Sequence, residues 1–386
     1  MKLAFKLAYR NLIRAGLRTW LNVIVLAFAF ILIVFYHGLN EGWNQQAKKA
    51  TIDWEVGKGE LRNDNYDPYD PFTIADGHGN IDQPNDLNLE PVLIRQGSIY
   101  PDGRLFSISI RGINVNQEIL KIPLQSLKNS KAEIPVVIGK RMSKSVNLKV
   151  GDQVLMRWRD AKGTYDAITI TIAEVFDCNI GAVDNGQIWM DIEKLWKITG
   201  MPKNEATYYI STIDRDYLEM EGWEYHNQAS LLNFIDELAE MDKIGAMVMY
   251  GLLLAIALLA IFDTQVLSIF RRQKEIGTYI ALGLTRRRVV AIFTIEGSMY
   301  SILATIVGII AGLPLFAYFA KNGIGMPQSE QGNVIAMADR VVPVFGIGLI
   351  INTIALVVIS ATIVSFLPAK KIAKMNPVDA LKGKMQ

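Results

Sequence analysis

The chain has 386 residues, of which 51% are hydrophobic and 20% charged, and its mean hydropathy is +0.21. It is too apolar for an ordinary soluble enzyme and too charged for membrane spans alone, so we expect a membrane protein with one sizeable soluble domain. Residues 41–243 contain 22 Lys or Arg and 32 Asp or Glu, whereas the rest of the chain contains 18 Lys or Arg and 6 Asp or Glu. The basic excess therefore lies beside the apolar segments and does not indicate a nucleic-acid partner.

The residues that usually carry metal or catalytic chemistry are sparse. A single cysteine, Cys178, excludes an internal disulfide framework and a Cys-based metal site, and the three scattered histidines lack ligand spacing. The acids of DNYDPYD at 64–70 lack the Gly and distal Glu of an EF-hand, so we expect a solvated loop there. Serine-hydrolase, zinc-protease and GxxxxGK[ST] motifs do not occur, so we expect no catalytic residue, no metal and no ATP site in this chain.

Four apolar stretches are long enough to cross a bilayer, at 19–40, 244–270, 289–320 and 341–367. Residues 1–18 carry five basic residues four apart and no acid, which indicates either an amphipathic helix on the inner leaflet or a simple basic flank. The segments 271–288 and 368–386 are also rich in basic residues, with one acid each. Because Lys and Arg mark cytoplasmic segments, both termini and the 271–288 loop are predicted inside, with 41–243 and 321–340 outside.

Two acids, Asp263 and Glu296, lie within predicted spans. Ionisable groups inside a membrane are costly, and their usual explanation is functional. Each acid lies eight residues from a flanking arginine, a separation of roughly 12 Å along a helix. Both acids are therefore expected near the lipid headgroups. We therefore weigh two interpretations, structural or interhelical hydrogen bonding first and a transport role second.

The outer segment, 41–243, is predicted to form an inserted α+β domain. Its expected strands are VLIRQG, GRLFSISIRGI, IPVVIG, DQVLMRW, DAITITIAEVF and ATYYISTI, separated by turns such as PDG at 101–103 and AKG at 161–163. Helices are expected at 139–148, 191–199 and from 230 to 243, leading into the second span. Residues 62–90, rich in Asn, Asp, Pro and Gly, are expected to form a long loop.

The basic loop 271–288, RRQKEIGTYIALGLTRRR, has an internal pattern of its own. Glu275, Ile276, Tyr279, Ile280 and Leu282 recur at helical spacing, and Gly283 follows where a helix needs a C-cap. This predicts a short amphipathic helix between two spans. Its apolar stripe either fills a groove on a partner or packs beneath the chain's own spans.

A span, an outer domain and three further spans without a Walker motif resemble the permease subunits of the MacB/FtsX-like ABC transporter superfamily (type VII, mechanotransmission). The segments at 271–289 and 368–384 are similar to the family's Arg-Glu-Ile-Gly…Ala-Leu-Gly signature and Pro-x-x-Ala-Leu tail, with Lys274 where Arg is usual. AYRNLIRAGLRTWL at 8–21 resembles its opening helix. Within the MacB-like outer domain, PVVIGKRMSKSVNLKVGDQVLM at 135–156 is similar to the lipoprotein-releasing LolC/LolE-like branch, which Asp184 also fits loosely.

The resemblance implies a non-catalytic, multi-pass protein of the bacterial inner membrane with a large periplasmic domain. A second permease, as copy or paralogue, and a dimer of cytoplasmic ATPases that bind ATP and Mg would complete the complex. The coupling element that docks on the ATPase would be Glu275, Ile276, Gly277, Ala281, Leu282 and Gly283. Membrane lipids, and a periplasmic lipoprotein, chaperone or adaptor, would be further partners.

Three functions follow from the resemblance. The first is ATP-driven extraction or release of lipoprotein, or of another lipophilic cargo, from the inner membrane. The second is MacB-type efflux of drugs, peptides or toxins with a periplasmic adaptor. The third is FtsX-like regulation of a cell-wall hydrolase without transport, while a membrane-bound enzyme ranks last because no motif supports it.

Overall fold

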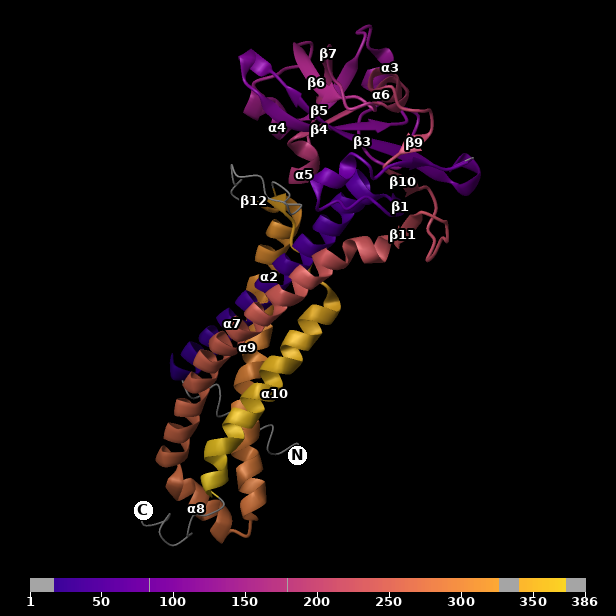
Figure 1. Ribbon diagram of the computed structural model, residues 1–386. Coiled ribbons are helices and arrows are strands. Elements are labelled where there is room, and N and C mark those ends of the chain that lie inside the picture. Colours follow the sequence, from indigo (N-terminus) through magenta and orange to yellow (C-terminus); the bar gives the residue numbers. More distant parts are fainter. Residues whose placement is uncertain (1–16, 83, 179, 326–339, 373–386) are drawn as a thin grey trace. The chain divides into compact units, whose positions relative to one another are not determined.

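The computed structural model describes residues 17–82, 84–178, 180–325 and 340–372 (Figure 1). The expected N-terminal amphipathic helix, most of the 321–340 loop and the tail beyond residue 372 lie outside the described residues. The chain divides into two units. The described residues of the helical unit lie within 17–42, 239–324 and 342–372, and those of the β-rich unit lie within 43–238, 325 and 340–341.

Four long helices carry the apolar stretches: α2 (Leu17–Thr51), α7 (Gln228–Arg271), α9 (Arg286–Asn322) and α10 (Ile347–Ile372). They are the described helices long and apolar enough to cross a membrane, with mean hydropathies of 2.2 to 2.5. The helix predicted from 230 to 243 is continuous with the second apolar stretch in α7. The shorter α8 (Gln273–Ala281) lies between α7 and α9 in sequence.

The end of α2 and the start of α10 differ clearly from the sequence-based boundaries. The last apolar stretch was expected from residue 341, but α10 begins at Ile347, after the short strand β13 (Arg340–Val341) and five residues without regular structure. Val344 instead donates its backbone N–H to the carbonyl of Gly38, 2.8 Å away. The first helix continues past residue 40 to Thr51, since 41–51 contain no proline to end it. A π-helical turn, Ile52–Val56, follows it.

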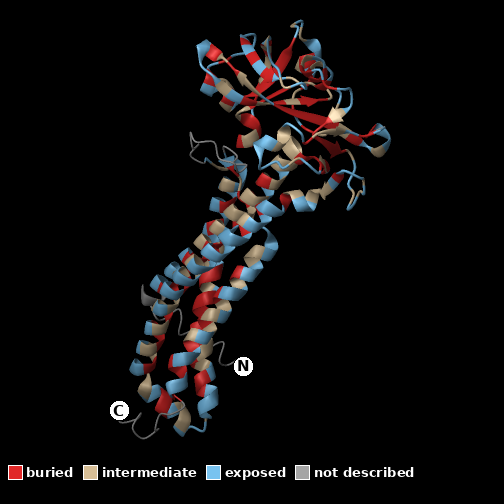
Figure 2. Ribbon diagram, viewed as in Figure 1, coloured by how far each residue is buried: buried red, intermediate tan, exposed pale blue. Residues whose placement is uncertain are grey.

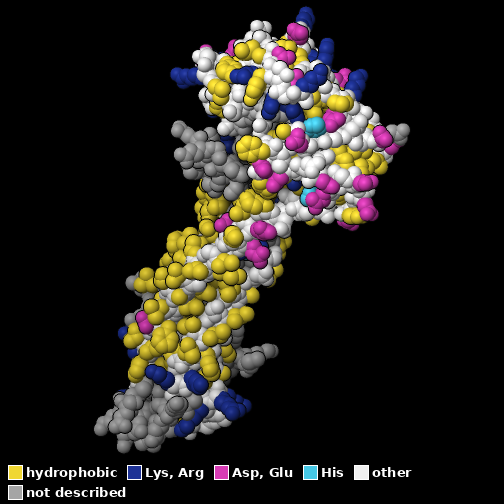
Figure 3. Space-filling model, viewed as in Figure 1, with side chains coloured by type: hydrophobic (Ala, Val, Ile, Leu, Met, Phe, Trp, Pro, Cys, Tyr) yellow, Lys and Arg dark blue, Asp and Glu magenta, His cyan; other side chains and the backbone are white. Residues whose placement is uncertain are grey.

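The helical unit is apolar both inside and outside. Its interior packs small residues such as Ala27, Ala257, Ala304 and Ala361 among larger ones, which lets the helix backbones approach closely. Large apolar side chains also cover the outward faces of the helices (Figures 2 and 3), as expected where lipid replaces water. Exposed examples on the four helices are Phe28, Leu259, Ile310 and Ile359.

The β-rich unit is built on a nine-stranded sheet with the order β11-β1-β10-β3-β4-β8-β5-β7-β6. The strands are β1 (Gly59–Asn63), β3 (Leu89–Ile99), β4 (Phe106–Ile113), β5 (Pro135–Gly139), β6 (Gln153–Arg159), β7 (Tyr165–Phe176), β8 (Gln187–Asp191), β10 (Tyr208–Ser211) and β11 (Trp223–Asn227). β4–β8 and β5–β7 are parallel, and the other pairs are antiparallel. Because β3 also pairs with β6, six of these strands close on themselves.

The central strands are buried on both faces, which explains their unbroken apolar runs. On β5, Val136 and Ile138 join one core while Val137 joins another on the opposite face. Residues of α4 (Lys140–Val146) and α6 (Ile192–Thr199) complete the first core. The six predicted strands and these two helices are confirmed, whereas the polar strands β1 and β11 and the short β8 were missed.

The remaining elements are short. They are β2 (Gly79–Asn80), β9 (Glu205–Ala206), β12 (Ile324–Gly325), β13 (Arg340–Val341), α3 (Gln125–Asn129), α5 (Gly181–Asp184) and the 3-10 turns Pro71–Ile74, Pro84–Leu87 and Pro101–Gly103. β2 pairs with β9, and β12 pairs with β13.

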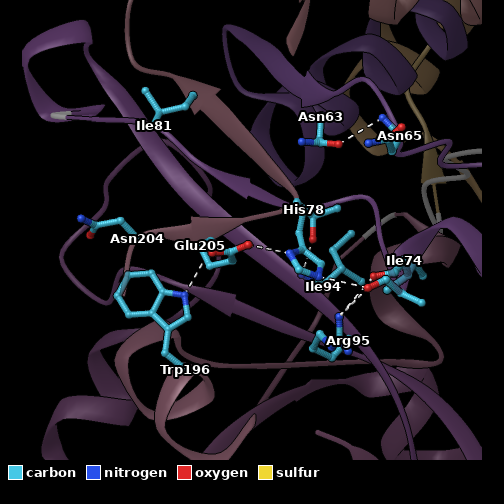
Figure 4. Close-up of polar contacts among 12 residues, drawn as sticks. Asn63, Asn65, Ile74, His78, Ile81, Ile94, Arg95, Trp196, Asn204 and Glu205 are labelled. Carbon is cyan, nitrogen blue, oxygen red and sulfur yellow. Dashed lines mark hydrogen bonds and ion pairs between the residues drawn. The ribbon is translucent and has the colours of Figure 1, made fainter. Parts of the chain in front are cut away.

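The segment 62–90 lacks long elements, as predicted, but side-chain contacts hold it to strands β3 and β9 of the same unit (Figure 4). His78 Nδ1 lies 2.7 Å from Glu205 Oε1, which joins the segment to β9. The buried Arg95 of β3 donates to the backbone carbonyl of Ile74 at 3.3 Å. These contacts attach the segment at two places along its length.

Candidate functional site

The basic loop at 271–288 is centred on α8, Gln273–Ala281. The helix does not run straight on from α7, because Arg272 has φ −103° and ψ 19°, outside the helical range. Backbone hydrogen bonds continue around this residue, from Arg272 N–H to the carbonyl of Ser268 and from Ile276 N–H to that of Arg272. The predicted short helix is therefore confirmed, and it follows α7 through a single-residue kink.

The C-terminal end of α8 forms a Schellman cap. Gly283 has φ +92°, a left-handed conformation that costs glycine little and other residues more. Its N–H donates to the carbonyl of Ile280 at 3.0 Å, and the N–H of Leu284 donates to that of Tyr279 at 3.0 Å. These are the two hydrogen bonds that define the motif. The C-cap predicted at Gly283 is confirmed.

The apolar face of α8 packs against its own helical unit. Ile276 is fully buried in a cluster with Ile269 of α7, Val289, Val290 and Phe293 of α9, and Ala369 and Ile372 of α10. Burying an isoleucine side chain contributes about 1.5–3 kcal/mol. Of the two interpretations of the stripe, packing beneath the chain's own spans therefore describes this structure.

The six residues predicted as the coupling element divide into two groups. Ile276 and Gly277 are buried within the helical unit. Glu275, Ala281, Leu282 and Gly283 are exposed, and Leu282 exposes 76% of its surface. Only the second group is available to a partner in this conformation.

An arginine that the sequence did not single out joins α8 to α9. Arg272 donates from Nε to Glu275 at 2.8 Å and from Nη1 to both carboxylate oxygens of Glu296, at 3.2 and 2.9 Å. Its guanidinium also lies 4.8 Å from the ring centre of Phe293. Glu296 is only 4% exposed, and Arg272, which lies outside α9, supplies the opposite charge that a buried carboxylate needs. We call Arg272, Glu275 and Glu296 the Arg272 clamp.

The two predicted intramembrane acids thus have different surroundings. Glu296 is buried in the clamp. Asp263 is exposed on α7, and no described residue forms an ion pair with it. The structure brings Glu296, but not Asp263, to the predicted coupling element.

Above the clamp, polar and small side chains join the four long helices. Asn22 of α2 donates to the Thr264 hydroxyl of α7 at 2.6 Å. Gln265, fully buried, lies against Gly297 of α9, where an added Cβ would come within 2.1 Å of the Ser365 hydroxyl of α10. Glycine at 297 therefore permits this close contact. Polar contacts of this kind set the register of helices that apolar packing alone leaves free to slide.

Basic side chains gather at the end of the helical unit that carries α8, beyond its apolar surface (Figure 3). They include Arg271 and Lys274 and the three arginines at 286–288, all exposed. This pattern matches the charged border of a membrane-spanning bundle. The fold and this site together indicate a membrane protein with four candidate spanning helices.

Comparison with known proteins agrees with that class. Residues 247–377, which include α8, α9 and α10, match the FtsX-like permease C-terminal family. The lipoprotein-releasing system transmembrane protein LolC of Xylella fastidiosa strain 9a5c is 22% identical over 306 residues, covering 71% of this chain and 72% of LolC. The chain therefore contains an FtsX-like permease domain, and LolC and MacB are among its homologues.

Two further relatives show how far the similarity extends. LolC of Neisseria meningitidis serogroup B is 19% identical over 257 residues, covering 59% of this chain and 61% of LolC. The macrolide export ATP-binding/permease protein MacB of Wolinella succinogenes is 28% identical over 166 residues, covering 42% of this chain and 23% of MacB. The LolC alignments thus extend over more of the chain than the MacB alignment.

Proposed function

We propose that this chain is the non-catalytic permease subunit of an ABC transporter in which α8 receives force from a separate cytoplasmic ATPase. The observation that carries the proposal is the Arg272 clamp, which joins α8 to α9 through a buried, charge-assisted contact. ATP and Mg would bind to the ATPase, since the chain has no Walker motif. A second permease, either a copy or a paralogue, would complete the membrane part.

Three attachments make α8 suitable for transmitting a push. The clamp holds its N-terminal end, the buried Ile276 holds its middle and the Schellman cap at Gly283 ends it rigidly. Because packed protein interiors deform little, a displacement of α8 would pass to α9 and α10 rather than be absorbed locally. From there it would reach the β-rich unit, which we place in the periplasm.

The partner-facing part of α8 is its exposed end. Leu282 and Ala281 offer an apolar anchor, and exposed basic residues lie on both sides in sequence. Such a surface fits an apolar pocket rimmed by acidic residues. We therefore revise the proposed contact set to Glu275, Ala281, Leu282 and Gly283, with Ile276 and Gly277 supporting the helix from behind.

The proposed topology follows from the basic flanks. They support an inner-membrane protein with both termini and α8 in the cytoplasm. The β-rich unit would then be a periplasmic domain of the MacB-like type, as the resemblance implies. Lysine and arginine at one end of each of the four apolar segments support this orientation.

A lipoprotein or another lipophilic molecule of the inner membrane is the proposed cargo. Its support is the LolC alignment, which covers more of both chains than the MacB alignment does. A periplasmic lipoprotein, chaperone or adaptor would meet the β-rich unit. MacB-type efflux and FtsX-like hydrolase regulation are the alternatives. ATPase stimulation of the purified complex by lipoprotein but not by amphiphilic drugs is the expected result, and the reverse would favour efflux.

The coupling assignment can be tested by crosslinking. A photoreactive amino acid at Leu282, 76% exposed, should crosslink in cells to a polypeptide that contains a Walker motif. The matched control is the same probe at Leu105, which is 60% exposed in the β-rich unit and should not capture that polypeptide. If Leu282 yields no such crosslink, or Leu105 captures the ATPase equally well, the coupling role of α8 is wrong.

A further inference from the structure

A groove of about 430 Å³ lies between α9 and α10 at the basic end of the helical unit. Its lining residues are Arg287, Val290, Ala291, Thr294 and Ile295 of α9 with Phe366 and Lys370 of α10. The five α9 positions recur at intervals of three and four, so they form one stripe along the helix. The volume is within the range of pockets that bind small organic ligands.

Direct helix contacts lie one turn farther along both helices. The hydroxyls of Ser298 and Thr362 are 2.9 Å apart, and Gly297 lies directly against Ser365. Between these contacts and the helix ends, the small side chain of Ala291 leaves the space that forms the groove. The groove is therefore a consequence of helix packing that is tight at one level and open at the next.

The two ends of the groove differ in chemistry. Arg287 and Lys370 are exposed, and among the described residues neither forms an ion pair with a carboxylate. No Asp or Glu lines the groove. Thr294, the polar residue of its inner part, donates its hydroxyl to the carbonyl of Val290 at 3.0 Å. The groove thus joins two available cations to an apolar channel whose one hydroxyl already has a partner.

We propose that this groove binds one anionic phospholipid, with its phosphate between Arg287 and Lys370 and an acyl chain against Ile295 and Phe366. Basic pockets between membrane helices are suited to anionic headgroups. Ile295 is eight residues beyond Arg287, which is roughly 12 Å of helix rise. An acyl chain reaches that depth from a headgroup at the membrane surface, whereas a water-soluble protein does not. Charge and depth together therefore favour a lipid.

The lipid would contact the same packing that supports α8. Val290 lines the groove and also belongs to the cluster that buries Ile276. A lipid in the groove would therefore pack against Val290 and stabilise the cluster that buries Ile276. The leaflet involved follows the orientation proposed above, but lipid binding itself requires neither that orientation nor an ATPase.

The test is native mass spectrometry of the purified full-length chain, titrated with phosphatidylglycerol or phosphatidylcholine of identical acyl chains. Wild type should bind its first phosphatidylglycerol at least tenfold more tightly than phosphatidylcholine. The double variant Arg287→Gln/Lys370→Gln should lose about thirtyfold in phosphatidylglycerol affinity, roughly fivefold per cation, and little in phosphatidylcholine affinity. Arg288→Gln/Lys371→Gln is the matched control, since it removes the same charge from residues that do not line the groove.

Equal loss of phosphatidylglycerol affinity in the two double variants would refute the proposal, because it would show diffuse surface attraction. Ala291→Trp gives an independent result by filling the groove, and it should weaken the first binding event for both lipids. Unchanged affinity in Ala291→Trp would also overturn the assignment, even if the charge variant failed to fold. If the charge variant altered the fraction of dimer but not lipid affinity, the groove would be an interface between copies and the lipid assignment would fail.

Discussion

Replacing Glu296 with glutamine should loosen α8 from the helical unit. The change removes the charge that Arg272 contacts at 2.9 and 3.2 Å, in a side chain that is 4% exposed. Two unit charges about 3 Å apart attract by roughly 5 kcal/mol at an effective dielectric constant of about 20, before desolvation is subtracted. Removing one partner of a buried pair costs about 3–5 kcal/mol, and the glutamine oxygen recovers part of this as a neutral hydrogen bond.

The expected net loss is about 2–3 kcal/mol in the free energy of opening α8, equivalent to roughly 30- to 150-fold faster exchange of its backbone amides. Hydrogen–deuterium exchange of the protein in nanodiscs, followed on peptides from 273–281, measures this directly. Peptides from α6 in the β-rich unit should be unchanged and serve as an internal reference.

Glu275→Gln is the matched control because Glu275 contacts the same arginine at 2.8 Å but has a side chain that is 55% exposed. Exposed ion pairs contribute about 0–1 kcal/mol, so its effect on exchange should not exceed about fivefold. Unchanged protection of α8 in Glu296→Gln would refute the clamp as the attachment. Equal effects of the two variants would show that burial does not set the strength of this contact.

Three further predictions concern backbone geometry, helix packing and pH. Gly283→Ala should destabilise α8 by about 1 kcal/mol because of its φ of +92°, whereas Gly251→Ala, a helical site with open space, should be neutral or stabilising in the same thermal melts. Gly297→Ala should cost about 1–3 kcal/mol through overlap with Ser365, and an unchanged melting temperature would contradict the close contact. Burial raises the pKa of Asp184 from its usual 3.8 to about 6, so the folded protein binds more protons than the unfolded chain between these values. Stability of the β-rich unit should therefore fall by up to about 2 kcal/mol as pH rises from 4 to 6, and Asp184→Asn should flatten this slope in urea titrations.

Much of the architecture followed from local sequence patterns. A run of about 20 apolar residues has few alternatives to a membrane helix, because its backbone must satisfy its own hydrogen bonds in lipid. The helical spacing of Ile276 and Ile280 and the glycine at 283 were sufficient to predict α8 and its cap. The apolar strands were also predictable, because runs of β-branched residues between turn residues are a local pattern. The polar strands β1 and β11 lack such runs.

The direction of the α8 stripe was not predictable from periodicity. An amphipathic helix has one apolar face whether that face binds a partner or its own chain. Here the ends of α7, α9 and α10 bury Ile276, so the apolar face of α8 is largely occupied by the chain's own helices. What remains exposed is Leu282, which the same pattern had placed with the stripe.

By itself the sequence determined the number of apolar spans, the position of the β-rich segment and the short capped helix in the basic loop, because each depends on neighbouring residues. Only the tertiary structure decided that Arg272 contacts Glu296, 24 positions away, and that Gly297 meets Ser365. The groove at Arg287 and Lys370 likewise combines two helices separated by a long segment. Such pairings depend on which helix faces meet, and residue spacing within one helix carries no information about its neighbour.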